Sequence, residues 1–196
     1  MQINTNRKIG IYASSGYGKS YLANKIASII KIPIYIYDTD REAINEIYFN
    51  YDNVKIYIPP IAESENIKTL NKWLKEKLTL SNIFIYIEDL DLFFDENSQL
   101  GDNSSEIKYI SSKGRHQRIG FMYSAKQLSH IPTKLRANTN LFFFGYFSND
   151  TEIDKIKKII GKRAYNEIYS KINPQEHEFL MYDTLSKELK IIKIGE

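Results

Sequence analysis

The sequence predicts a mixed α/β fold in which helices cover the faces of a mainly parallel β-sheet. Strand-length runs rich in Ile, Tyr and Phe alternate with helix-length segments, and this alternation is typical of such three-layer folds. Several runs are apolar at consecutive positions, as expected for strands that are buried on both faces. A chain of 196 residues is sufficient for one core, so we expect a single domain over residues 1–196.

The elements follow from local patterns. The predicted strands are 8–14, 33–38, 54–59, 82–89, 120–125 and 140–147, and the predicted helices are 18–31, 65–78 and a segment from Asn149 that Gly161 divides in two. The tail alternates apolar and polar residues around a turn near Ser186, which predicts a C-terminal β-hairpin. Residues 95–106 are polar and lack periodicity, so we expect the least ordered segment there.

The composition narrows the class of protein. The chain has no cysteine, which excludes disulfides, thiolate metal sites and thiol nucleophiles and fits a cytoplasmic location. The net charge of +3 is too small to indicate a nucleic-acid partner by itself. The apolar run at 141–147 has the length of a strand, so we expect neither a signal peptide nor a membrane span.

Residues 13–20, Ala-Ser-Ser-Gly-Tyr-Gly-Lys-Ser, match a phosphate-binding loop except at the first position. In the pattern G-x-x-x-x-G-K-[ST], backbone N–H groups surround the phosphates, the lysine contacts the β- and γ-oxygens, and the hydroxyl binds Mg²⁺. The predicted nucleotide contacts are Ser15, Gly16, Tyr17, Gly18, Lys19, Ser20 and Tyr21. Ala13 replaces the usual first glycine, which is acceptable if this residue does not need a positive φ.

An acidic strand end is the second part of the predicted site. The apolar run 82–87 leads directly into Glu88 and Asp89, where a metal-binding and a water-activating carboxylate are needed. The common order is aspartate followed by glutamate, and this sequence inverts it. We assign Glu88, with Ser20, to the metal and Asp89 to water activation; the two roles could be exchanged, and Asp91 is a third candidate.

Charge is ordered along the next part of the chain. Residues 88–106 contain seven acids and no Lys or Arg, whereas residues 107–149 contain no acid and the cations Lys108, Lys113, Arg115, Arg118, Lys126, Lys134 and Arg136. The basic block spans a predicted strand, so its cations should gather at the two ends of that strand. One end would face the nucleotide or a neighbouring subunit, and the other could meet a polyanion.

Residues 111–150 contain a succession of further motifs. An arginine precedes a Gly-led strand, a glutamine follows that strand, an I-P-x-x-L-R-x-N stretch comes next, and an apolar strand closes on S-x-D. Together with the phosphate loop and the acidic strand end, this order over about residues 7–152 resembles the FtsK/HerA superfamily of DNA-pumping P-loop ATPases. The resemblance implies a P-loop NTPase domain of the RecA or FtsK/HerA type that hydrolyses ATP with Mg²⁺.

The resemblance also implies partners. Members form rings, usually of six subunits, that pull double-stranded DNA through the centre. A chain of this size without a pore or membrane domain resembles in particular the genome-packaging ATPases of tailless, membrane-containing viruses, archaeal ones included. Docking on a capsid or portal-vertex protein, no insertion into a membrane, and a cytoplasmic or virion-associated location are implied as well.

Residue roles follow from the same resemblance. An arginine before the Gly-led strand would enter the ATP site of the neighbouring subunit; Arg115 is the first candidate and Arg118 the second. Gln127 matches the polar residue that contacts the attacking water or the γ-phosphate. Arg136 and Asn138 would act at a subunit interface or cap the short helix before the next strand.

Two other functions are compatible with a phosphate loop. A small-molecule kinase would need an arginine-rich lid, for which the sequence offers no convincing segment. A nucleotide-dependent assembly or secretion factor would resemble the filamentous-phage assembly proteins that share the G-R-H stretch, but those generally carry a transmembrane segment. Asp38, at the end of the second strand, is expected to be an ordinary turn aspartate.

Overall fold

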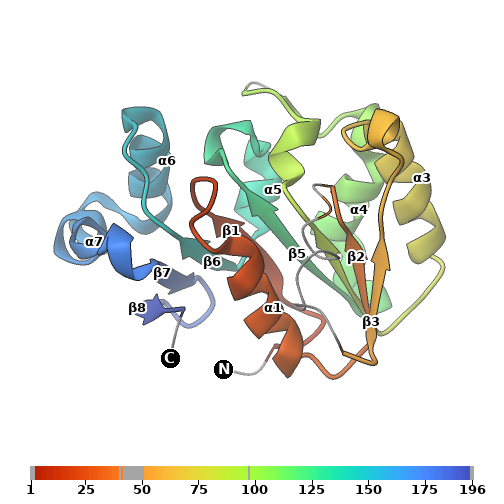
Figure 1. The fold of residues 1–196 in the computed structure, drawn as a ribbon, viewed down its shortest axis with the longest axis horizontal. Coiled ribbons are helices and arrows are strands. Elements are labelled where there is room, and N and C mark those ends of the chain that lie inside the picture. The colour runs from red at the N-terminus through yellow and green to blue at the C-terminus, as the bar shows by residue number, and fades with distance from the viewer. Residues whose placement is uncertain (1–2, 40, 42–50, 97, 195–196) are drawn as a thin grey trace.

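The computed structural model describes residues 3–39, 41, 51–96 and 98–194. An eight-stranded sheet forms the middle layer and helices cover both of its faces (Figure 1). The strands are β1 (Lys8–Tyr12), β2 (Ile34–Tyr37), β3 (Val54–Tyr57), β4 (Ile83–Ile87), β5 (Ile119–Ala125), β6 (Leu141–Phe144), β7 (Glu178–Asp183) and β8 (Glu188–Lys193). The predicted strands and the terminal hairpin are therefore all present.

The strand order decides which loops meet. It is β3-β2-β4-β5-β1-β6-β7-β8; the first six strands are parallel to one another, β7 is antiparallel to β6, and β8 is antiparallel to β7. Strand β5 lies between β1 and β4. The phosphate loop after β1 and the acidic residues after β4 are thus at the same edge of the sheet, because the carboxyl ends of parallel strands share an edge.

The helices are α1 (Lys19–Ile29), α3 (Ile67–Lys77), α4 (Ser105–Lys113), α5 (Thr133–Asn138), α6 (Asp150–Ile160) and α7 (Lys162–Glu167). Two apolar cores lie on the two faces of the sheet. Helix α1 contributes Leu22 and Ile26 to one core, and the other contains Leu70 of α3, Ile110 of α4 and Ile156 of α6. Each of these apolar positions is buried, so the helices are held by packing on the sheet.

Local capping explains where the longer helices begin. Asn66 accepts a hydrogen bond from the backbone N–H of Lys68 at the start of α3, and Asn149 does the same for Glu152 in α6. Gly161, with φ of 89°, separates α6 from α7 as predicted. In the described part of the chain, no helix has both the length and the apolar character needed to cross a bilayer.

The expected irregular segment 95–106 is only partly irregular. A 3₁₀ turn covers Asp102–Ser104, and α4 begins at Ser105, inside the predicted range. Residue 97 is outside the described residues. Ile107 and Ile110 are the α4 apolar residues that reach the core, too few for a clear helical period in a polar stretch.

Candidate nucleotide site

The phosphate loop joins β1 to α1. Gly16 and Gly18 have φ of 71° and 92°, in the left-handed region that glycine adopts without strain. Helix α1 begins at Lys19, and Gly18 at its N-cap supplies no capping side chain. The first N–H groups of α1 therefore need an acceptor. The positive end of the helix dipole lies at the same place. This geometry suits a phosphate group.

Ala13 fits at the first loop position because of a glycine far along the chain. The described non-glycine residues with positive φ do not include Ala13, so alanine needs no strained backbone there. Its side chain is fully buried. A Cβ atom added to Gly145, just after β6, would lie 2.6 Å from both the Ala13 methyl group and the Tyr17 ring. Gly145 thus leaves the space that these two side chains fill.

Lys19 and Ser20 connect the loop to the acidic strand end. The Lys19 side chain is only 6% exposed, and its Nζ lies 3.5 Å from the Ser14 carbonyl oxygen and 3.8 Å from Asp89 Oδ1. Ser20 Oγ donates a 2.7 Å hydrogen bond to Glu88 Oε1. The structure therefore brings together the predicted metal ligands Ser20 and Glu88.

Asp38 is closer to this site than the sequence suggested. Strands β2 and β4 are paired with Tyr37 opposite Ile87, so the residues that follow them, Asp38 and Glu88, are neighbours. Both side chains are buried. Burial raises the pKa of Glu88 well above its usual range, and the adjacent Asp38 carboxyl raises this pKa further. The expectation that Asp38 is an ordinary turn aspartate does not account for its contact with Glu88.

These carboxyls have unused oxygen atoms. Glu88 Oε2 and both carboxyl oxygens of Asp38 are buried without a hydrogen-bond partner among the described residues. A buried carboxylate without a donor is costly, and a divalent cation is the usual compensation. The chemistry of this donor set, with the Ser20 hydroxyl beside it, fits Mg²⁺ bound to a nucleotide.

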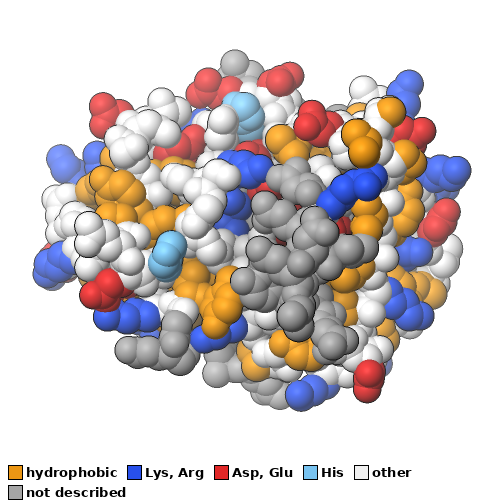
Figure 2. Space-filling view, viewed as in Figure 1, with side chains coloured by type: hydrophobic (Ala, Val, Ile, Leu, Met, Phe, Trp, Pro, Cys, Tyr) orange, Lys and Arg blue, Asp and Glu red, His pale blue; other side chains and the backbone are white. Residues whose placement is uncertain are grey.

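Asp89 lies between two lysines. Its backbone is left-handed, with φ of 44°, and its N–H donates to Ser124 Oγ at 2.9 Å. Lys126 Nζ is 2.8 Å from Asp89 Oδ2, and Lys19 Nζ is 3.8 Å from the other oxygen, Oδ1. In the space-filling view, Lys and Arg side chains reach the surface near the centre, next to acidic ones, over the ends of β1 and β5 (Figure 2). Lys126 is a site residue that the motifs did not reveal.

Asp91, the third candidate carboxylate, is already occupied by backbone groups. Its oxygens accept hydrogen bonds from the N–H of Lys126 at 3.1 Å and of Gln127 at 2.9 Å. Asp91 is buried in the 3₁₀ turn Leu90–Phe93. These contacts fix the start of the loop after β5 and favour a positioning role for Asp91 over contact with the nucleotide.

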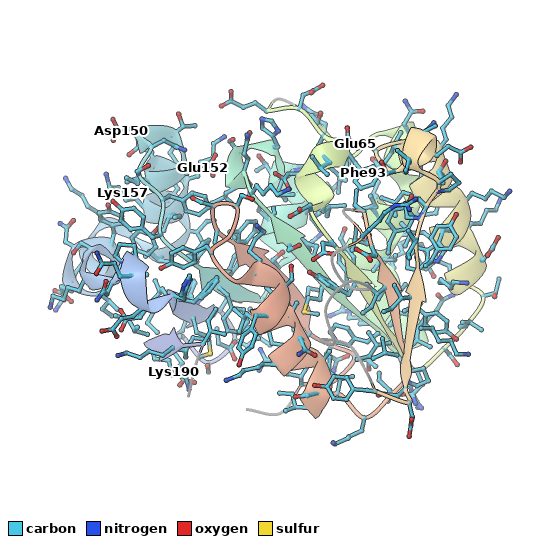
Figure 3. The ribbon with its side chains drawn as sticks, viewed as in Figure 1. Glu65, Phe93, Asp150, Glu152, Lys157 and Lys190 are labelled. Carbon is cyan, nitrogen blue, oxygen red and sulfur yellow. The ribbon has the colours of Figure 1, made fainter. Side chains whose placement is uncertain are left out.

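A second carboxylate holds the same loop from α6. Glu152 is buried, and its two oxygens each lie 3.2 Å from the backbone nitrogen of Ser129, which donates to them. Figure 3 shows Glu152 directed inward from α6, whereas Asp150 and Lys157 lie on the outer side of the helix. Gln127, at the start of this loop, has an exposed side chain at the nucleotide edge of the sheet.

The two candidate arginines are at the opposite edge. Arg115 is in the 3₁₀ turn Gly114–Gln117 and Arg118 follows it, both exposed before β5 begins. Strands β1 and β5 are parallel, so these arginines and the phosphate loop are separated by the length of the sheet. A seven-residue strand spans roughly 20 Å. The structure does not place either arginine near the phosphate loop of its own chain.

The aromatic loop residues face away from the phosphate position. The Tyr17 hydroxyl donates to the Glu178 carbonyl at 2.9 Å, and its ring packs on Phe179. The Tyr21 ring lies beneath the Lys25 ammonium group, 5.3 Å from its centroid. Tyr17 therefore offers its backbone to a nucleotide, and its side chain binds the C-terminal hairpin. Ser15 is exposed at the tip of the loop.

A glycine-rich turn between a parallel strand and a helix, with an acidic strand end two strands away, defines the P-loop NTPase class of folds. Among solved structures, the genome packaging NTPase B204 from Sulfolobus turreted icosahedral virus 2, in complex with ATP-gammaS, superposes with a TM-score of 0.77 and 17% identity, covering 97% of this chain and 98% of that one. The DNA-packaging ATPase B204 from Sulfolobus turreted icosahedral virus superposes with a TM-score of 0.77 and 19% identity, covering 97% of this chain and 98% of that one.

In a second group of similar structures, this chain matches one part of a longer chain. EssC (ATPases 2 and 3) from Geobacillus thermodenitrificans has a TM-score of 0.64 and 19% identity over 97% of this chain and 40% of that chain. No family model and no curated protein matches the sequence. The predicted α/β P-loop fold and its likeness to packaging ATPases are confirmed at the level of the fold.

Proposed function

We propose that this protein is an ATP-driven DNA translocase that packages a viral genome, pumping double-stranded DNA into a procapsid. The observation that carries the proposal is a phosphate loop joined to Glu88 and Asp89 within a fold that matches a genome packaging NTPase over 97% of the chain. We further propose that residues 1–196 act as one domain, in the cytoplasm or on the virion, and dock on a capsid or portal-vertex protein.

Each side chain of the site then has a chemical task. The loop N–H groups and Lys19 bind the β- and γ-phosphates. Ser20 and Glu88 hold Mg²⁺, which when bound neutralises phosphate charge. Asp89 orients the attacking water while Lys126, 2.8 Å away, balances its charge. Gln127 contacts the γ-phosphate or the water from the end of β5.

The position of the arginines supports a homo-oligomer, in the form of a ring. Arg115 and Arg118 are too far from the phosphate loop of their own chain to contact its nucleotide. Exposed cations at the opposite edge are suitably placed to enter the site of a neighbour. A cation supplied in this way stabilises the charge that develops on the γ-phosphate, an effect of about 10³–10⁵ in rate.

The test is the ATPase rate per subunit as a function of protein concentration, with and without double-stranded DNA. We expect the rate per subunit to rise with concentration, because sites are completed between chains, and to rise further with DNA. Calorimetry with ATPγS and Mg²⁺ provides the matching binding measurement. A protein that binds no nucleotide, or turns over at a rate independent of both concentration and DNA, contradicts the proposal.

A second candidate is a nucleotide-dependent assembly or secretion factor. It is favoured by the likeness to EssC and to Thermomonospora curvata EccC (ATPases 2 and 3), solved in complex with a signal sequence peptide, at a TM-score of 0.57. The distinguishing result is turnover that ignores DNA and responds to a peptide.

A further inference from the structure

A pocket with a strongly positive lining lies away from the nucleotide site. It is an open hollow of about 560 Å³, lined by residues of α5, α6, β6, β7 and the turn between β7 and β8. The cations of the lining are Arg136, Lys155, Lys158 and Lys187, and the lining contains no acid. A neighbouring hollow of about 580 Å³ shares Arg136 and Lys155 and adds Lys134, with Glu96 at its rim.

Most of this charge is not neutralised within the chain. The Arg136 guanidinium donates to the Leu128 carbonyl at 3.2 Å and to Thr133 Oγ1 at 2.8 Å, both neutral acceptors. Lys155 has a long contact of 3.8 Å with Glu96. Among the described residues, no acidic oxygen lies within 4 Å of the ammonium groups of Lys158 or Lys187.

The neighbouring lysine on α6 behaves differently. Lys157 pairs with Asp154 at 3.3 Å, lies over the Tyr165 ring and points to the outer side of the helix (Figure 3). On α6, Lys157 thus has a close acidic partner outside the pocket, whereas in the pocket lining Lys155 has only the 3.8 Å contact with Glu96 and Lys158 has no acidic partner among the described residues. Unpaired like charges repel one another, and a bound anion removes that repulsion.

The walls of the pocket are fixed by hydrogen bonds. Thr139, in the lining, is buried and its Oγ1 contacts the Tyr123 hydroxyl at 2.7 Å and donates to the Leu135 carbonyl at 3.0 Å. Asp183 accepts from the N–H of Leu185 at 2.9 Å and holds the β7–β8 turn that carries Lys187. Arg7 forms an ion pair with the same carboxylate, with Nη2 2.9 Å from Oδ2. The pocket is thus formed before any ligand binds.

We propose that this pocket binds a phosphodiester of the DNA backbone. The inference rests on the proposed function and adds a contact surface to it. Cations and threonine hydroxyls bind phosphate oxygens without reading bases, so binding is independent of DNA sequence. The hollow is open and larger than one phosphate group, and its cations come from α5, α6 and the β7–β8 turn, so a backbone segment can lie across it.

The test is the salt dependence of binding to a fluorescein-labelled DNA duplex, measured by anisotropy in the presence of ATPγS and Mg²⁺. Each phosphate contact contributes about 0.9 to the slope of log K against log salt. We expect Lys158→Gln and Lys187→Gln each to lower the slope by about one, and the double variant by about two. ATPase activity without DNA and the melting temperature stay at wild-type values.

Lys75→Gln is the matched control. Lys75 and Lys158 are both exposed lysines in the last turn of an 11-residue helix, but Lys75 is on α3, outside the pocket. The control removes the same charge and leaves the slope unchanged. Equal slopes for Lys75→Gln and the pocket variants overturn the inference while the DNA-dependent function stands.

Two further outcomes separate the possible failures. If the wild type neither binds the duplex nor is stimulated by it, the proposed DNA function fails and this inference fails with it. If the pocket variants bind the duplex normally but lose affinity for a polyaspartate probe, the pocket binds an acidic protein segment, and the DNA assignment is overturned.

Discussion

The contact between Ala13 and Gly145 shows how a single residue adapts the phosphate loop. The usual glycine at the first loop position is absent, and a glycine from the end of β6 provides the missing space instead. The loop packs on that strand through the Ala13 methyl group and the Tyr17 ring. Space, rather than backbone freedom, is what position 13 requires.

Gly145→Ala should therefore damage the loop. The new Cβ would lie 2.6 Å from two side chains, so we expect a loss of about 1–3 kcal/mol in the free energy of unfolding and weaker ATPγS binding. Urea unfolding and calorimetry measure the two effects. Gly101→Ala is the control, since its Cβ would meet no atom closer than 4.0 Å. A stable Gly145→Ala protein with unchanged ATPγS affinity would show that the loop can relax at no cost.

Lys19 carries a second prediction at this scale. Lys19→Ala removes the buried ammonium group between the loop and Asp89, so ATP turnover should fall by about 100-fold or more. Lys31→Ala, an exposed lysine beyond α1, serves as the control and should keep wild-type turnover. Retained turnover in Lys19→Ala would remove this lysine from the site.

The sequence predicted part of the site and missed another part for a physical reason. Lys19, Ser20 and Glu88 follow from local patterns, because a loop motif and the end of an apolar strand are both visible in one segment. The contact of Asp38 with Glu88 and the ion pair of Lys126 with Asp89 depend on which strands are neighbours. Strand order is a property of the whole sheet and has no local signature.

At the scale of elements, an ion pair joins the first strand region to the C-terminal hairpin. Arg7 precedes β1, and its guanidinium contacts both oxygens of Asp183 at 2.9 Å. Burial alone would raise the pKa of Asp183, but the hydrogen bonds from Arg7 and from the N–H of Leu185 outweigh it and hold this pKa below its ordinary value.

Asp183→Asn should make stability less dependent on pH. A lowered carboxyl pKa stabilises the folded state above the unfolded pKa of about 3.9, and this stability is lost as pH falls through the lower folded-state pKa. We expect the variant to lose about 2 kcal/mol at pH 7 and to approach the wild type at acidic pH. Urea unfolding at several pH values measures the difference.

Asp154→Asn is the control for that experiment. Asp154 pairs with Lys157 at an exposed position, where ion pairs contribute about 0–1 kcal/mol. A loss for Asp183→Asn that remains constant down to acidic pH would mean that packing, and not the ion pair, is responsible.

The elements themselves were predictable to different degrees. The parallel strands are short, mainly apolar runs, so every predicted range overlaps an observed strand, although β6 ends three residues before its predicted end. Helix α4 was not predicted, because its two buried isoleucines are separated by polar residues and follow a polar stretch. Its helical state depends on packing against β5 and α3.

At the scale of the whole molecule, the parallel sheet separates the phosphate loop from the candidate arginines. The phosphate loop follows β1, and Arg115 precedes β5 at the other edge. A single chain thus presents a site at one edge and a cation at the other. In the proposed ring, a complete site would form where these two edges of neighbouring chains meet.

Mixing two inactive variants tests this arrangement. Lys19→Ala and Arg115→Ala should each lose turnover, with ATP binding retained in Arg115→Ala. In an equal mixture, the intact loop of one variant meets the intact arginine of the other at about a quarter of the interfaces, and activity returns in proportion. Arg118→Ala in the same assay identifies which arginine acts. A mixture that stays inactive, or full activity in Arg115→Ala alone, contradicts the assignment.

The packing of the hairpin on the phosphate loop links two distant parts of the chain. The Tyr17 hydroxyl donates to the Glu178 carbonyl, and Ile194 lies where it would meet a Cβ on Gly18 at 3.0 Å. A substitution that loosens the hairpin should therefore also loosen the phosphate loop, although it touches no residue of the nucleotide site.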